Sequence, residues 1–99
     1  MASTDDDAIM ARFVADYLAL LDQRIGTIQA HLDVGNDTTA QVAMLSLEST
    51  STMVGAVELA QIVADLRAGL ERGDRTRFTE LNRAMVAAAA RVPASLGRS

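Results

Sequence analysis

The amino-acid sequence predicts an all-α protein, an antiparallel up-down four-helix bundle with an additional N-terminal helix. Apolar residues recur at intervals of three and four along most of the chain, which is the spacing of one face of an α-helix. Two short segments, Gly35-Asn36-Asp37 and Gly73-Asp74, place a glycine where one helix can end and a polar residue that can cap the next. Such short connections favour antiparallel neighbours. No stretch alternates polar and apolar residues as a strand does, so we expect no sheet.

The first third of the chain is predicted to be helical from its beginning. Ser3, Thr4 and the run Asp5-Asp6-Asp7 can cap the first helix, and the aspartates complement its dipole. A cation site is the alternative for the aspartates, but hard cations need ligands from several positions. A regular 4-3-4 apolar repeat then runs from Leu21 to Leu32. The pattern changes near residues 20–22, which allows a break there, although no proline forces one.

Three further helices follow, each with a recognisable core face. The expected core positions are Ala40, Ala43, Met44, Leu47, Thr50, Ser51 and Val54 around the segment 38–53, then Leu59, Ile62 or Val63, Leu66 and Leu70, and finally Phe78, Leu81, Met85, Ala88 and Val92. Gly55 marks a turn or a close contact between helices. We expect Pro93 to end the last helix and the tail through Ser99 to be loose.

Length and composition indicate one domain, residues 1–99, with a core between about residues 9 and 92. The sequence has no cysteine, which excludes disulfides and thiolate chemistry, and its one histidine, His31, leaves no His-rich metal site. We therefore expect neither a metal nor a cofactor. All nine basic residues are arginine, as is common in GC-rich genomes, and the net charge is −4 without a basic stripe, so nucleic-acid binding is not expected.

The hydropathy pattern predicts neither a membrane span nor a signal peptide. The chain has no apolar run near 18 residues and no positively charged leader followed by an apolar segment. A cytoplasmic protein is therefore expected.

The stretch from Leu45 to Ala56, L-S-L-E-S-T-S-T-M-V-G-A, is the most informative part of the sequence. On a helical wheel centred on Leu47, the expected core positions from Ala40 to Val54 fall within roughly 60° of the centre. Leu45 falls about 160° away, on a face that is otherwise mostly polar. The neighbours of Leu45 on that outer face are Thr38, Gln41, Glu48, Ser49 and Thr52.

This stretch resembles the signature of histidine-containing phosphotransfer (HPt) domains, roughly H-x-L-K-G-S-x-x-x-x-G-A. The family leucine matches Leu47, the Ser/Thr-rich turn matches residues 49–51, and the final G-A matches residues 55–56. The phosphate-accepting histidine matches Leu45, and the lysine that helps to hold the phosphate matches Glu48. The resemblance covers most of the chain and also implies the leading helix before the bundle, since the family has one at about this place.

Both chemical residues of the motif are absent, and this decides the functional prediction. Leu45 offers no lone pair to a phosphoryl group, and a carboxylate at Glu48 opposes an incoming phosphate. We therefore expect no enzymatic activity. The family meets receiver domains with this face, so the resemblance implies a docking module of a bacterial two-component system that binds a receiver domain of a response regulator or hybrid kinase, or another signalling protein. The expected partner-binding residues are Gln41, Val42, Leu45, Glu48, Ser49, Thr52 and Met53.

Other readings of the same residues stay open. His31 could serve as the phosphate acceptor of an active relay protein, although a histidine near a helix C-terminus also interacts well with the helix dipole. The chain could instead be a structural dimerisation bundle unrelated to signalling. Independently of these two readings, the outer apolar residues could be covered by the leading helix of the same chain or by a dimer partner.

Overall fold

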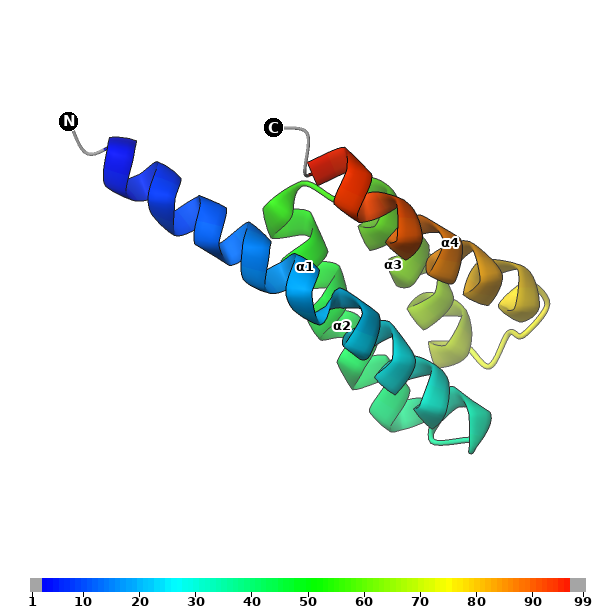
Figure 1. Cartoon of the computed structure of the whole chain (residues 1–99). Coiled ribbons are helices and arrows are strands. Elements are labelled where there is room, and N and C mark those ends of the chain that lie inside the picture. Colours follow the sequence, from blue (N-terminus) through cyan, green and yellow to red (C-terminus); the bar gives the residue numbers. More distant parts are fainter. Residues whose placement is uncertain (1–2, 97–99) are drawn as a thin grey trace.

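The computed structural model describes residues 3–96, which form four α-helices and no strand. The helices are α1 (Ser3–Asp33), α2 (Asp37–Val54), α3 (Val57–Glu71) and α4 (Phe78–Leu96). They run up and down in turn, with α2 packed between α1 and α3, and with α4 packed against α3 and α1 (Figure 1). The predicted four-helix bundle is therefore confirmed. None of the described helices is long and apolar enough to cross a membrane.

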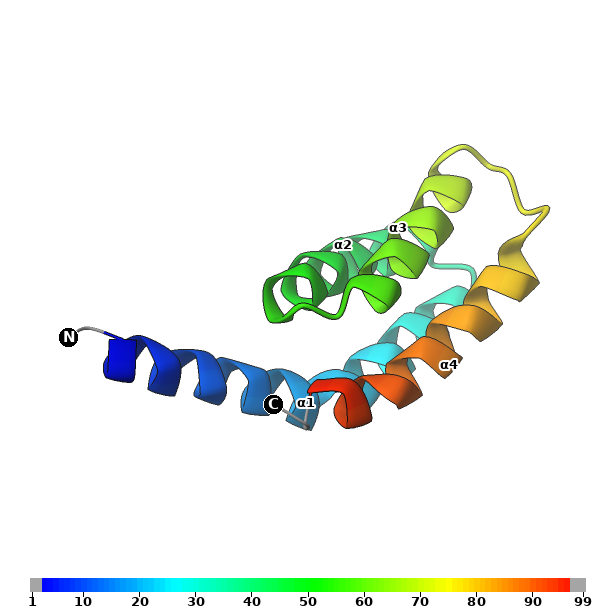
Figure 2. The same ribbon diagram turned by 90° about the horizontal axis from the view of Figure 1, so that it is seen from above.

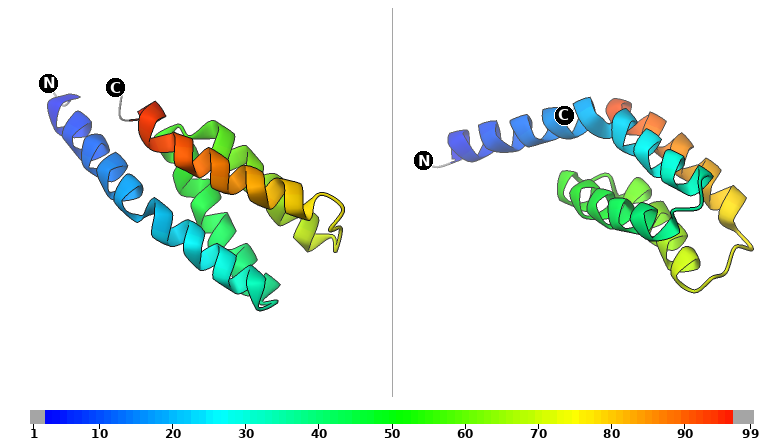
Figure 3. Two further views of the ribbon diagram at one scale, coloured as in Figure 1. Left: turned by 45° about the vertical axis from the view of Figure 1, so that its right-hand side comes forward. Right: turned by 90° about the horizontal axis from the view of Figure 1, so that it is seen from below.

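The prediction of an additional N-terminal helix is wrong, because α1 is a single helix of 31 residues. No proline interrupts it, and Gly26 stays helical. The N-terminal turns of α1 project beyond the other helices, as the views from above and below show (Figures 2 and 3). Ile9 and Met10 on this extension are 68% and 49% exposed. The buried face continues through residue 20, since Tyr17 and Leu21 both lie in the core, and the backbone does not break there.

The end of α4 also differs from the prediction, because the helix continues through Pro93 to Leu96. A proline has a helical φ, and in a last turn it removes only one backbone hydrogen bond. Leu96 packs against the core and holds that turn in place. The loose tail is therefore wrong for residues 94–96, and the remaining residues, 97–99, lie outside the described part of the chain. The side chains of residues 1–5, which include the expected caps, also lie outside it.

The turns between helices follow the glycine pattern but not the expected caps. Gly55 has a left-handed backbone (φ 85°), and its N–H bonds to the carbonyls at the end of α2. Asn36 precedes α2 without a capping hydrogen bond from its side chain. The neighbouring Asp37 accepts a hydrogen bond from Arg75 at 2.9 Å instead, which links the α1–α2 turn to the α3–α4 loop. In that loop, Asp74 accepts the backbone N–H of Thr76, before α4 begins.

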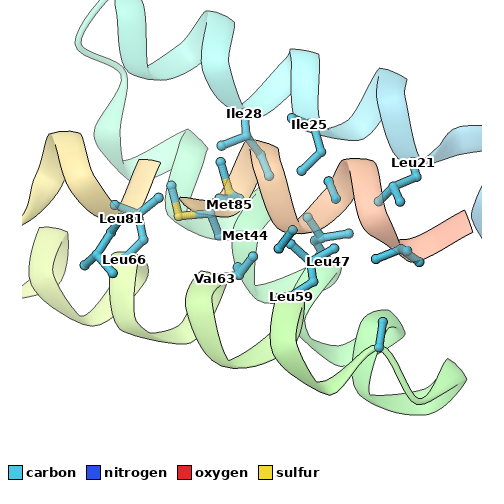
Figure 4. Close-up of a cluster of buried hydrophobic side chains, with 14 of the residues drawn as sticks. Leu21, Ile25, Ile28, Met44, Leu47, Leu59, Val63, Leu66, Leu81 and Met85 are labelled. Carbon is cyan, nitrogen blue, oxygen red and sulfur yellow. The ribbon is translucent and has the colours of Figure 1, made fainter. Parts of the chain in front are cut away.

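The core lies along the bundle axis and draws side chains from all four helices (Figure 4). In α2, Ala40, Met44, Leu47 and Ser51 are buried, as the helical wheel predicts. Ser51 is the one polar side chain among the buried residues described, and its hydroxyl pairs with the Tyr17 hydroxyl of α1 at 2.7 Å. A buried hydroxyl without a partner would be costly, so this pair fixes how α1 and α2 lie against each other.

The helical phase of α2 can be tested through its two leucines. Leu47 is 0% exposed and Leu45 is 50% exposed. Leu47→Ala should therefore lower the free energy of unfolding by about 2–5 kcal/mol, since it leaves a cavity. Leu45→Ala should cost well under that. Urea denaturation of both variants measures the difference, and equal destabilisation would contradict the phase.

The stability of the fold should fall at alkaline pH because of Tyr17. Burial raises the pKa of its phenol, while the Ser51 hydrogen bond and the charge of Arg24 oppose that rise. The folded protein thus keeps a proton that the unfolded chain loses near pH 10, so stability decreases as the pH rises through about 10. The chain has one tyrosine and no lysine or cysteine, so no other side chain titrates there. Denaturation at a series of pH values should show this slope in the wild type and not in Tyr17→Phe.

Candidate functional site

The outward side of α2 carries the candidate site, which we call the docking face. It consists of the predicted residues Gln41, Val42, Leu45, Glu48, Ser49, Thr52 and Met53. Val42, Leu45 and Met53 are 67%, 50% and 63% exposed. Neither the extension of α1 nor any other described segment buries them, so cover by the chain's own helix is ruled out as an explanation for these apolar residues.

The apolar residues of the docking face form a pair and a separate outlier. Val42 and Leu45 are one turn apart, so their side chains are neighbours on the helix surface. Met53 lies eight residues beyond Leu45, about 12 Å along the axis. The exposed hydroxyls of Ser49 and Thr52 lie between them. The centre of the docking face is therefore the Val42–Leu45 pair, with a polar surround.

On its α3 side, the docking face ends in an ion pair. Arg67 of α3 approaches the Glu48 carboxylate at 3.0 Å, and both side chains are about a quarter exposed. A second, longer contact joins Arg67 to Glu71 at 3.9 Å. The negative charge that the sequence places at residue 48 is therefore largely compensated. The sequence could not indicate Arg67, because its distance from Glu48 depends on how α2 and α3 pack.

On its α1 side, the docking face ends at Arg24. The guanidinium of Arg24 donates to the Ser46 hydroxyl at 2.6 Å and to the Thr50 hydroxyl at 3.0 Å. Sequence reasoning missed Arg24 and Ser46. The one signal for Arg24 in the sequence is that it directly precedes Ile25, which belongs to the apolar face of its helix, so Arg24 lies at the border of that face. That signal does not identify the facing helix.

His31 lies apart from the docking face. It is half-buried in the last turn of α1, and its carbonyl accepts the backbone N–H of Asn36. Because Arg24 contacts Ser46 and Thr50 in the antiparallel pair, His31 is level with the first turn of α2. It is therefore roughly two turns away from Leu45 along the helix axis.

Comparisons with protein-family models, with curated proteins and with solved structures found no match to this chain. The HPt resemblance therefore rests on the residues of α2 and on the four-helix bundle. No group of three or more His, Cys, Asp or Glu side chains that could hold a metal ion occurs among the described residues.

Among the described residues of the docking face, no hydroxyl is hydrogen-bonded to a side chain that could act as a base. Leu45 supplies no nucleophile, and the hydroxyls of Ser46 and Thr50 contact a guanidinium, which cannot act as a base. An apolar pair with a polar surround on a rigid helix is suited to contact with another protein.

Proposed function

We propose that this chain is an HPt-like signalling module that docks a partner protein and does not carry phosphate. The observation that carries the proposal is the exposed Val42–Leu45 pair on a well-packed helix. In the resemblance to the HPt motif, Leu45 matches the phosphate-accepting histidine. The proposed partner is the receiver domain of a response regulator or hybrid kinase, or another signalling protein, in the cytoplasm of a bacterium.

The physical support for docking is the cost of leaving this surface in water. Covering the two apolar side chains removes hydrocarbon from water at roughly 25 cal/mol per Å². The helix beneath is held by Leu47 and by the Tyr17–Ser51 hydrogen bond, so little order has to be created on binding. The leucine that replaces the histidine thus adds apolar contact area where a relay protein needs a nucleophile.

The support for a receiver as partner comes from the frame of the motif. Leu47, Gly55 and Ala56 match the HPt pattern, and these residues form part of the buried side and the end of α2. A surface that kept this frame keeps the shape that receivers contact in the resembling family. Compensation of Glu48 by Arg67 also removes a charge that would repel an acidic partner.

The docking face can be tested with a matched pair of valines. Val42→Asp should weaken binding of a receiver domain at least tenfold, since it places a charge in the apolar contact. Val86→Asp is the control, because Val86 is also exposed, at 45%, but lies on α4. Titration calorimetry with receivers encoded near this gene provides the measurement. Equal affinity of the two variants would argue against the docking face.

The absence of phosphate transfer is tested by restoring the missing residues. A radiolabelled receiver should not label the wild type, and Leu45→His alone should acquire little label. Leu45→His with Glu48→Lys should acquire acid-labile label, because the site then has both a nucleophile and a cation. Leu45→His with Glu48→Gln should give an intermediate result, since it frees Arg67 from Glu48.

Two outcomes would favour the other readings. Labelling of the wild type that disappears in His31→Ala would indicate an active relay protein with His31 as acceptor. Tight self-association without binding of any receiver or kinase would indicate a structural dimerisation bundle.

A further inference from the structure

Arg24 differs from the other arginines of the described chain. Arg67, Arg75, Arg77 and Arg91 each pair with a carboxylate at 3.3 Å or less. Among the described residues, those without such a pair are Arg12, Arg24, Arg72 and Arg83, and of these only Arg24 is half-buried. It therefore holds a partly desolvated positive charge whose contacts are neutral hydroxyls. A charge in this position gains more from an added anion than a fully exposed one does.

The contacts of Arg24 leave part of its guanidinium available. Its two terminal nitrogens each donate one N–H, to Thr50 and to Ser46. A guanidinium has five N–H groups in a planar fork, so three are not used by these bonds. Arg24 lines an open hollow of about 130 Å³ together with Phe13, Asp16, Tyr17, Leu20 and Thr50. Arg24 also lines a second open hollow of about 270 Å³, together with Gln23, Thr27, Ala43 and Ser46.

We propose that Arg24, together with the hydroxyl of Ser46, binds a carboxylate side chain of the protein that docks on α2. The Thr50 hydroxyl accepts from Arg24 and donates to the backbone carbonyls of Ser46 and Leu47, so it orients the guanidinium and does not contact the anion. The inference rests on the proposed function for the identity of the partner. Ser46 lies one turn from both Val42 and Ser49, so the anion would be held at the edge of the docking face. The hollow lined by Phe13 and Leu20 is mostly apolar and can accept the aliphatic part of the carboxylate side chain.

Charge balance favours a carboxylate over a phosphate group. One guanidinium compensates one negative charge, and a planar carboxylate matches its fork of donors. A phosphate would bring a second negative charge to a site that Asp16 borders, in a protein of net charge −4. No ion pair joins Asp16 to Arg24, so Asp16 does not already occupy the position of the incoming anion.

The anion site itself is tested with acetate and the isolated protein. In nuclear magnetic resonance spectra, acetate should shift the Arg24 Nε–H signal and the amides of Ser46 and Thr50, whereas chloride at the same ionic strength should not. Arg24→Gln should abolish these shifts. Arg83→Gln, which removes the same charge from an exposed position on α4, should leave them unchanged. Absence of the shifts, or equal shifts at all arginines, would overturn the inference.

Binding of the receiver tests the role of the site. Arg24→Gln should weaken the affinity by about tenfold to a hundredfold and reduce its dependence on salt, since one charge-assisted contact is lost. Arg24→Lys should retain part of the affinity, because it keeps the charge but not the fork. Thermal unfolding of each variant separates this loss from a loss of structure, and Arg83→Gln should bind like the wild type.

Equal binding by wild type and Arg24→Gln would overturn the inference and leave the docking proposal standing. If acetate shifts the signals but no receiver binds, the docking proposal is overturned and the anion site at Arg24 remains.

Discussion

The arrangement of α1 against α2 depends on the hydrogen bond between Tyr17 and Ser51. Every other buried side chain described in this core is apolar, and apolar burial is not directional, so it sets the register of two helices less sharply than a hydrogen bond does. The two hydroxyls are 2.7 Å apart, and a shift that separated them would leave both oxygens without a partner. The bond therefore reinforces the phase that the buried residues Met44 and Leu47 give to α2, and with it the set of residues that point outward.

That register also determines the edges of the docking face. With Ser51 held by α1, Ser46 and Thr50 lie beside Arg24, and Glu48 lies toward Arg67 of α3. The exposed Val42–Leu45 pair is thus bordered by an uncompensated cation on one side and by a neutralised ion pair on the other. A partner that covers this surface meets an apolar centre with a positive edge, which selects against basic partners and favours acidic ones.

Much of the fold could be predicted from the sequence, because it depends on local periodicity. The phase of α2 follows from the spacing of Met44, Leu47 and Ser51, and all three are buried. The length of α1 could not be predicted. The spacing of apolar residues in a helix is the same whether or not other helices cover them, so it does not show whether one helix continues or two follow each other. Contacts between helices, such as those of Arg24 and Arg67, were also out of reach. These contacts depend on the rotation of each helix about its own axis and on the register between neighbouring helices. A single sequence indicates neither of these.

The central claim is that another protein covers the outward side of α2. The most direct measurement is a map of backbone amide signals of this chain as a receiver domain is added. The signals that move should belong to residues 41–53 and to the neighbourhood of Arg24, while those of the outer side of α4 around Val86 should stay in place. Movement confined to the extension of α1, or to α4, would contradict it.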